Sequence, residues 1–336
     1  MVVGSGENKY EWIDTWASYP DSEQVRNGWV HPGMVVTGMG ELYTTNTCDP
    51  TILIYDLDGK LLRSWSAGGT EVHDITLIEE DGTEYLWITD NGSKRQPEIG
   101  YEYPPESPTA SGRVLKTALD GKIQMLLSLP DLPDYEGSRC AVTETAVNEE
   151  RFGGNGDIWV ADGYGKSLVH RYDKSGTYIS TLNGEEGAGR FNCPHGIFVN
   201  TRGSEPEIYV ADRASGRIQV FDAEGKFKRV FGEDFLTLPS TMVSYGDQMI
   251  IGQLSAKLTV VDKDDNLVCH LGANDEVCEV DGWPNNRDDS GKVIPTALLN
   301  PGRFNSPHGL AVDRSGNLYI AEWLIGGRLT KLLRRS

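Results

Sequence analysis

The 336-residue chain has no apolar run close to the length of a membrane-spanning helix and no segment of long helical periodicity. It has no Cys-x-x-Cys pair either, and its five cysteines are widely scattered. These absences argue against a membrane protein, a zinc ribbon and a dithiol redox site. The N-terminus lacks a basic segment followed by an apolar one. We therefore expect a cytoplasmic protein, or a periplasmic or secreted one if a leader peptide has been removed.

Basic residues are scarce relative to acidic ones. The chain has 31 lysines and arginines against 50 aspartates and glutamates, which gives a formal net charge of −19 at pH 7. The resulting field repels polyanions such as nucleic acid and acidic membrane surfaces. We therefore expect neither nucleic acid nor a membrane as a partner. The oligomeric state that we expect is a monomer.

Glycine, in contrast, is abundant, with 39 residues. Short runs of β-branched residues alternate with Asp-Gly, Ser-Gly and Asn-Gly pairs, which mark tight turns between strands. This pattern predicts an all-β protein.

One short pattern recurs along the chain. Pro-His-Gly-hydrophobe-x-Val occurs at Pro194–Val199 and Pro307–Val312, and a variant occurs at Val72–Leu77. A second short strand that ends in an acidic residue follows each of them. Alignment on this pattern predicts six copies, which begin near Pro32, His73, Thr143, His195, Ser240 and His308.

The copies predict a closed ring of four-stranded blades. The last copy has only three strands and ends at Leu329–Leu333, whereas Tyr10–Trp16 resembles the fourth strands of the other copies. Pairing of this N-terminal strand with the last blade would close the ring and remove two sheet edges. We therefore expect residues 1–336 to form a single all-β domain, a six-bladed β-propeller. Nearly the whole chain resembles the NHL-repeat propellers.

Two connections are longer than a ring of blades requires. They span residues 92–112 and 272–304, and both lie next to blades that carry a repeat histidine. Long insertions in a compact domain are often functional, so we interpret both as lid loops.

Three of the six histidines occupy the same position of the repeat. His73, His195 and His308 each begin the innermost strand of alternate blades, which line the central channel of a propeller. Alternate blades of a six-fold ring are a third of a turn apart, so the three imidazoles should converge on the axis. Three histidines with an open fourth position suit zinc or a similar divalent metal. The alternative is that Pro-His-Gly is only a common strand start, with imidazoles hydrogen-bonded in the channel.

The other three histidines do not fit this pattern. His31 falls one position early in His31-Pro32-Gly33, so strand alternation should turn it away from the metal. His170 lies in a third strand and His270 ends an outer strand. For these three we expect surface or packing roles.

Three segments resemble a known enzyme family. Residues 157–164, 192–196 and 209–221 are similar to segments of peptidyl-amidoglycolate lyase, also called peptidyl-α-hydroxyglycine α-amidating lyase. This family cleaves the C–N bond of a C-terminal α-hydroxyglycine to give a peptide amide and glyoxylate. The resemblance implies a small-molecule or peptide C-terminal substrate and a bound zinc. It also implies Tyr164 and Arg213 as catalytic residues, and His73, His195 and His308 as the zinc ligands.

Residue chemistry supports these roles independently. Tyr164 and Arg213 follow the second strands of adjacent blades, so we expect them on one rim of the ring. An arginine binds a substrate carboxylate with two parallel hydrogen bonds. A tyrosine acts as a base near neutral pH only where cationic neighbours lower the pKa of its phenol, here a metal and Arg213. The alternatives are a rim aromatic, and a salt bridge from Arg213 to Asp212 or Asp90.

The chain departs from the family pattern in its charged residues. Gly309 stands where the family has an acidic residue linked to a calcium site. Asp74 and Glu144 could still bring acidic oxygens into the channel, which leaves room for calcium. The first-blade arginine of the family has no match, and Lys94 and Arg95 are candidates to supply its charge to the substrate.

The disulfide pattern of the family is also absent. Cys140 matches a disulfide cysteine of the family, but its partner position holds Gly165. A lost disulfide favours a reducing compartment or a distant branch of the family.

Three functions therefore remain open. The first is the metal-dependent lyase of the resemblance. The second is another three-histidine lyase or hydrolase that acts on a small hydroxylated or sugar-derived compound. The third is a non-catalytic NHL propeller that binds protein or glycan.

Overall fold

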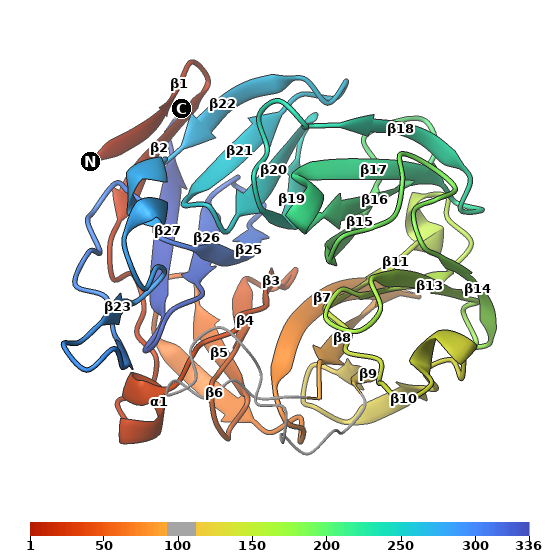
Figure 1. Ribbon diagram of the computed structural model, residues 1–336, viewed down its shortest axis with the longest axis horizontal. Helices are drawn as coiled ribbons and strands as arrows, with labels where there is room; N and C mark the ends of the chain where they lie inside the picture. Colours follow the sequence, from red (N-terminus) through yellow and green to blue (C-terminus); the bar gives the residue numbers. More distant parts are fainter. Residues whose placement is uncertain (93–111, 336) are drawn as a thin grey trace.

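Six antiparallel sheets surround a central axis in the computed structural model, which describes residues 1–92 and 112–335 (Figure 1). The fold is a six-bladed β-propeller, as the repeat predicts. Blade 1 contains β3 (Met34–Val36), β4 (Glu41–Thr45), β5 (Ile52–Asp56) and β6 (Leu61–Trp65). Blade 2 contains β7 (Val72–Glu80), β8 (Thr83–Asp90), β9 (Arg113–Ala118) and β10 (Ile123–Leu127). Blade 3 contains β11 (Glu144–Val147), β12 (Ile158–Asp162), β13 (Leu168–Tyr172) and β14 (Tyr178–Leu182).

The remaining blades follow the same order from the axis outward. Blade 4 contains β15 (Pro194–Asn200), β16 (Glu207–Asp212), β17 (Arg217–Asp222) and β18 (Phe227–Phe231). Blade 5 contains β19 (Pro239–Tyr245), β20 (Gln248–Gln253), β21 (Lys257–Val261) and β22 (Leu267–Leu271). Blade 6 contains β25 (Pro307–Val312), β26 (Leu318–Glu322), β27 (Arg328–Arg334), β2 (Asn8–Ile13) and β1 (Val2–Ser5).

Helical segments are few and short in the part of the chain that the structure describes. They are α1 (Glu23–Asn27) and the 3₁₀ turns η2 (Pro133–Tyr135), η3 (Glu150–Phe152), η4 (Arg213–Ser215) and η5 (Asp275–Glu279). Within the described ranges, none of the helices has the length and apolar character needed to cross a bilayer.

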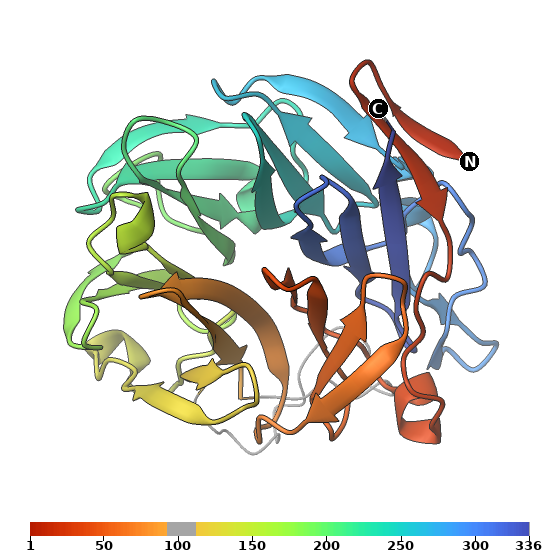
Figure 2. The same cartoon turned by 180° about the vertical axis from the view of Figure 1, so that it is seen from behind.

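The N-terminal strand closes the ring. Tyr10–Ile13 of β2 pairs antiparallel with Lys331–Arg334 of β27, and Figure 2 shows the two chain ends side by side. The side chains of Tyr10 and Trp12 are buried between blades 5 and 6. The predicted bounds, Tyr10–Trp16, are shifted toward the C-terminus, because β2 begins at Asn8 and ends at Ile13. A further strand that the sequence did not predict, β1, pairs with β2 and makes this the one five-stranded sheet among the described residues.

The second strand of most blades ends in an acidic residue. Its carboxylate accepts hydrogen bonds from the loop that precedes the inner strand of the same blade. Asp90 accepts hydrogen bonds from the backbone N–H groups of Thr70 and Glu71, both at 3.0 Å. Asp162 and Asp212 act in the same way in blades 3 and 4, each through an N–H at 2.6 Å. These buried carboxylates satisfy backbone donors that the ring encloses. In these blades the acidic residue that ends the second strand therefore holds the loop that precedes the inner strand.

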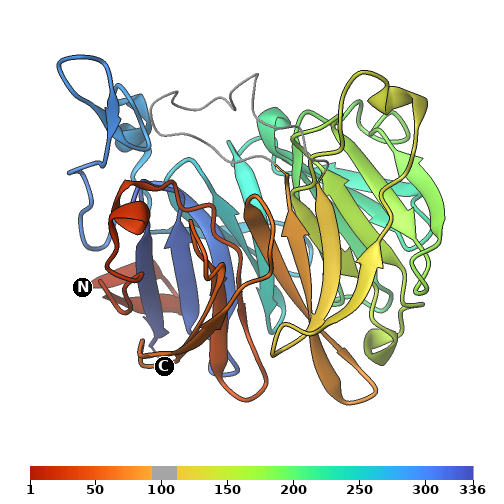
Figure 3. The ribbon, with the colours of Figure 1, turned by 90° about the horizontal axis from the view of Figure 1, so that it is seen from below.

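The insertion at 272–304 stands above one face of the ring, where Figure 3 shows its blue hairpin. The hairpin consists of β23 (Asn286–Arg287) and β24 (Val293–Ile294). It is anchored to blade 6, because the Trp283 indole N–H donates to the Asn305 carbonyl at 3.1 Å and the Ile325 N–H donates to the Asn285 side chain at 3.0 Å. Its role as a lid stays a prediction. The other insertion, with Lys94 and Arg95, lies outside the described residues.

Candidate metal centre

Each of the three repeat histidines is the extra residue of a β-bulge at the start of its inner strand. In blade 4, Pro194 pairs with Asp212 and Gly196 with Ala211, so His195 has no partner across the ladder. The pairings around His73 and His308 skip one residue in the same way. A bulge re-aims the side chain of the extra residue. The imidazoles therefore turn toward the propeller axis.

The glycine after the histidine allows the next blade to approach. A Cβ on Gly196 would lie 2.6 Å from the carbonyl oxygen of Ser240, and a Cβ on Gly309 would lie 2.7 Å from that of Pro32. Real Cβ atoms do not come this close to a carbonyl oxygen, so only glycine fits. The glycine of the Pro-His-Gly pattern therefore indicates a close contact between neighbouring blades.

The same carbonyl groups orient the imidazoles. Nδ1 of His195 lies 2.9 Å from the Ser240 oxygen, and Nδ1 of His308 lies 2.9 Å from the Pro32 oxygen. Nδ1 of His73 lies 2.6 Å from the Thr143 oxygen of blade 3. A carbonyl can only accept, so Nδ1 carries the proton and Nε2 presents its lone pair in a neutral ring. All three Nε2 atoms therefore face the axis as potential metal ligands.

His31 joins this cluster, so the expectation that it turns away is wrong. Alternation holds only within a strand, and His31 lies in the coil segment before β3. Gly33 lets this segment approach blade 2, because a Cβ there would lie 2.5 Å from the backbone of Asp74. Thr45 holds the segment by donating its hydroxyl to the His31 carbonyl at 2.9 Å. One signal was present in the sequence: His31-Pro32-Gly33 has the residue types of Pro-His-Gly in another order.

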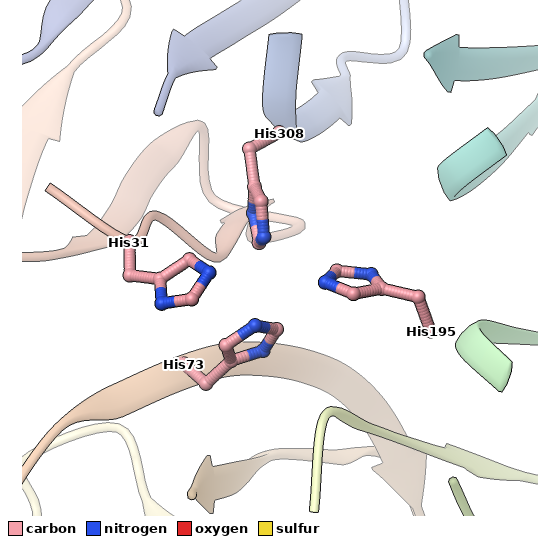
Figure 4. A group of neighbouring side chains, drawn as sticks. All are labelled: His31, His73, His195 and His308. Carbon is pink, nitrogen blue, oxygen red and sulfur yellow. The ribbon is translucent and has the colours of Figure 1, made fainter. Parts of the chain in front are cut away.

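The four histidines form one buried group (Figure 4). One potential ligand atom from each of His31, His73, His195 and His308 lies within 4.8 Å of all the others. Burial lowers the pKa of His195 well below its usual value, and the nearby Arg213 guanidinium lowers it further. A neutral imidazole is the form that binds metal. A set of imidazole nitrogens whose outer N–H groups are held by carbonyl or carboxylate oxygens fits zinc or a similar divalent ion.

The hydroxyl of Tyr164 lies among these nitrogens. Its oxygen is 3.0 Å from Nε2 of His195, 3.2 Å from Nε2 of His31 and 3.3 Å from Nε2 of His73. Gly163, the residue before Tyr164, allows this approach. A Cβ at this position would lie 2.6 Å from the Pro194 carbonyl oxygen. The structure thus brings Tyr164 to the histidine cluster predicted from the repeat.

Arg213 lies beside the same hydroxyl. Its Nη1 donates to the Tyr164 oxygen at 3.2 Å, and its guanidinium carbon lies 5.3 Å from the centre of the tyrosine ring. The acids weighed as alternative partners pair with other arginines, Asp212 with Arg217 at 2.8 Å and Asp90 with Arg113 at 3.0 Å. A cation next to a phenol stabilises the phenolate form. The pair can therefore combine anion binding with proton transfer.

The predicted channel acids lie further along the axis. A cavity of about 220 Å³ follows the inner strands, and Asp74 and Glu144 line it among apolar side chains. Enclosure in the ring raises the pKa of Asp74 well above its usual value. The pKa of Glu144 is raised by enclosure and also by the charge of Asp74. Both acids therefore line the channel and lie close enough for the charge of one to act on the other. Their relation to a calcium ion stays a prediction.

The remaining predicted residues take no part in the cluster. His170 is buried in blade 3, with Nε2 at 2.8 Å from the Tyr135 hydroxyl and Nδ1 at 2.8 Å from the Thr181 hydroxyl. His270 lies 3.0 Å from the Thr259 hydroxyl in blade 5. Both are packing residues in the structure. Cys140 is buried, and no disulfide joins two residues of the described ranges.

Comparisons with known proteins agree with the resemblance. No family model matches the chain. It is 29% identical over 221 residues to NHL repeat-containing protein 3 of Homo sapiens, covering 63% of this chain and 58% of that protein. It is 25% identical over 317 residues to peptidyl-alpha-hydroxyglycine alpha-amidating lyase 1 of Drosophila melanogaster, covering 88% of this chain and 51% of that protein. The chain thus spans about half the length of these two relatives.

Solved structures share the fold. A streptogramin B lyase superposes with a TM-score of 0.58 at 13% identity, covering 97% of this chain and 98% of the other. A protein of unknown function from Bacteroides thetaiotaomicron superposes with a TM-score of 0.61 at 14% identity, covering 99% and 75%. At these identities the likeness concerns the fold alone. The homologues of this chain are NHL repeat-containing proteins and peptidyl-α-hydroxyglycine α-amidating lyases. The chain itself folds as a six-bladed β-propeller, as its repeat predicts.

Proposed function

We propose that the protein is a metal-dependent lyase that cleaves the C–N bond of an α-hydroxyglycine-type substrate to an amide and glyoxylate. One observation carries the proposal. The Tyr164 hydroxyl lies within 3.2 Å of both a histidine nitrogen and the Arg213 guanidinium. This arrangement can bind an anionic substrate and move a proton at the same point. Lyases among the homologues support the reaction class.

The metal of this proposal is zinc or a similar divalent ion held by His73, His195 and His308. Their potential ligand atoms lie within 4.8 Å of one another in a buried site. Backbone carbonyls of neighbouring blades fix their outer nitrogens. Once bound, such an ion lowers the pKa of an attached hydroxyl group and polarises a neighbouring carbonyl or carboxylate.

Arg213 would bind the substrate carboxylate. Its guanidinium can make two parallel hydrogen bonds to a carboxylate, which fixes the plane of that group as well as its position. Because Nη1 of Arg213 already contacts the Tyr164 hydroxyl, a carboxylate bound there would hold the adjacent carbon near the tyrosine. The carbon next to the carboxylate is the one that carries the hydroxyl and the amide nitrogen in α-hydroxyglycine.

Tyr164 would then move the proton. The substrate hydroxyl gives its proton to the Tyr164 phenolate, the form that the Arg213 guanidinium stabilises. An electron pair of the substrate oxygen then forms the carbonyl of glyoxylate. The C–N bond breaks and its electron pair goes to nitrogen, which takes a proton and leaves as the amide. The reaction needs no oxidant or reductant, because one proton is removed from oxygen and one is added to nitrogen. A single acid–base group can therefore serve both transfers.

The proposal is tested by measuring glyoxylate released from an N-acyl-α-hydroxyglycine. We expect release that stops after chelation and returns with added zinc. Metal binding without release of glyoxylate would remove the specific lyase and favour another metal-dependent lyase or hydrolase. Absence of both metal binding and glyoxylate release would favour a non-catalytic propeller that binds protein or glycan. A matched protein with His270→Ala should behave like the native one, because His270 lies outside the cluster.

A further inference from the structure

The geometry points to His31 as a fourth nitrogen ligand of the metal, one that gives up its position when substrate binds. The inference rests on the proposed function in two respects: both need a metal at the histidine cluster, and the exchange needs the proposed substrate. It goes beyond the three-histidine set that the repeat predicts, because His31 lies in the segment before the inner strand of blade 1 and not at the repeat position.

The position of His31 is that of a ligand. Its ring centre lies 4.1 Å from that of His73 and 4.7 Å from that of His308. Figure 4 shows the ring facing the same space as the other three imidazoles. All four potential ligand atoms lie within 4.8 Å of one another in a buried site. Four converging nitrogens are the number that a tetrahedral zinc site needs.

Glu71 orients His31 toward this space. Its Oε1 lies 2.5 Å from Nδ1 of His31, and its own backbone N–H is held by Asp90 at 3.0 Å. A carboxylate on the outer nitrogen is common for metal-bound histidine, where it fixes the ring and strengthens the ligand. The Glu71–His31 pair is therefore built in the way that metal ligands are built.

His31 differs from the other three in what holds it. The others are bulge residues of inner strands, and backbone carbonyls hold their outer nitrogens. His31 lies in coil, and a side chain holds its ring. A site closed permanently by four protein ligands is typical of structural zinc, whereas a catalytic site keeps one position for substrate. Because His31 belongs to no inner strand, a rotation of its side chain away from the metal leaves the strands that form the ring in place.

Cobalt in place of zinc tests the assignment, because the visible absorption of Co²⁺ reports its coordination number and ligands. We expect His31→Ala to change the spectrum of the Co²⁺-loaded protein and to weaken Co²⁺ binding roughly ten- to a hundredfold. Glu71→Gln should change both in the same direction but by less. Glu71→Gln also serves as the second variant if the His31→Ala protein does not fold. His270→Ala, which lies outside the cluster, should keep the native spectrum.

The exchange is tested in the Tyr164→Phe protein, which should bind substrate but turn it over slowly. Adding N-acyl-α-hydroxyglycine should shift its Co²⁺ spectrum toward that of His31→Ala. An unchanged spectrum with bound substrate would overturn the exchange. Native spectrum and affinity in both His31→Ala and Glu71→Gln would overturn the fourth ligand and leave the proposed function standing. A native protein that binds no Co²⁺ would overturn the proposed function as well.

Discussion

The phenolic oxygen of Tyr164 lies 3.0 Å from Nε2 of His195, although the two residues belong to adjacent blades. The contact depends on two glycines, because Gly163 and Gly196 each allow a close approach to backbone carbonyls. Removing the phenolic oxygen alone leaves this packing intact. The chemistry of the site can therefore be tested separately from the fold.

Replacing Tyr164 by phenylalanine should abolish most activity and preserve structure. Glyoxylate release should fall roughly 10²- to 10⁴-fold, because the group that transfers the proton is lost. Metal content and circular dichroism should match the native protein. Tyr178→Phe is the control, since it removes the hydroxyl of an exposed tyrosine in β14. Full activity in Tyr164→Phe would discard this role and keep the reaction.

Replacing Arg213 by lysine should impair the use of substrate while keeping the positive charge. A lysine cannot make the two parallel hydrogen bonds that fix a carboxylate, so kcat/KM should fall by roughly a hundredfold through misplacement. Steady-state rates of glyoxylate release measure this. Arg190→Lys, at an exposed site, should leave the rate unchanged. Equal rates in native and Arg213→Lys proteins would mean that the carboxylate is bound elsewhere.

Replacing any one of His73, His195 and His308 by alanine should weaken zinc binding sharply. Each substitution removes one of the nitrogens that converge on the buried point. Zinc retained after dialysis, measured by elemental analysis, should fall from about one per chain toward zero. His270→Ala should retain zinc. Stoichiometric zinc in a protein that lacks all three histidines would place the metal elsewhere.

Removing residues 1–17 should destabilise the whole ring. The deletion takes away β2 and the buried aromatic rings of Tyr10 and Trp12. Loss of one large buried aromatic costs about 3–5 kcal/mol, and Tm should fall by more than about 10 °C. Removing only residues 1–6 takes β1, which is mostly exposed, and should cost much less. Equal Tm values for the native and 18–336 proteins would contradict closure by β2.

Acid should weaken the fold through His170. Burial lowers the pKa of this imidazole to about 4 in the folded protein, against about 6.5 in the unfolded chain. Above pH 6.5 the His170 ring is mostly neutral in both the folded and the unfolded state, so its titration has little effect on the free energy of unfolding. As the pH falls from 6.5 toward 4, the unfolded chain takes up the proton first, and stability is lost. Between pH 7 and pH 5 this amounts to about 2 kcal/mol.

Urea unfolding at pH 7 and pH 5 measures the effect of His170. His170→Gln has no titrating ring, so it should lose about 2 kcal/mol less than the native protein over this interval. The neighbouring Asp162, whose pKa burial raises, remains in both proteins and largely cancels in the comparison. An identical pH dependence in the two proteins would contradict the lowered pKa.

Local patterns were enough to predict the architecture. Four short strands and three connections recur in each of blades 1 to 5, and each strand pairs with its neighbour in the chain. The repeat position therefore identifies the inner strands, and with them His73, His195 and His308. Because β2 pairs with a strand more than 300 positions away, its bounds were predicted less well than those inside a blade. Nothing local indicated β1 as a further strand.

The sequence by itself determined the ring of blades and the slot that three histidines share, because both follow from short-range periodicity. Only the tertiary structure decided that His31 and Glu71 join them. His31 lies in coil, where strand alternation does not apply, and its direction depends on how closely Gly33 lets blade 1 approach blade 2. The meeting of Tyr164 with three histidines from three other blades is likewise a property of ring closure, because no sequence spacing connects them.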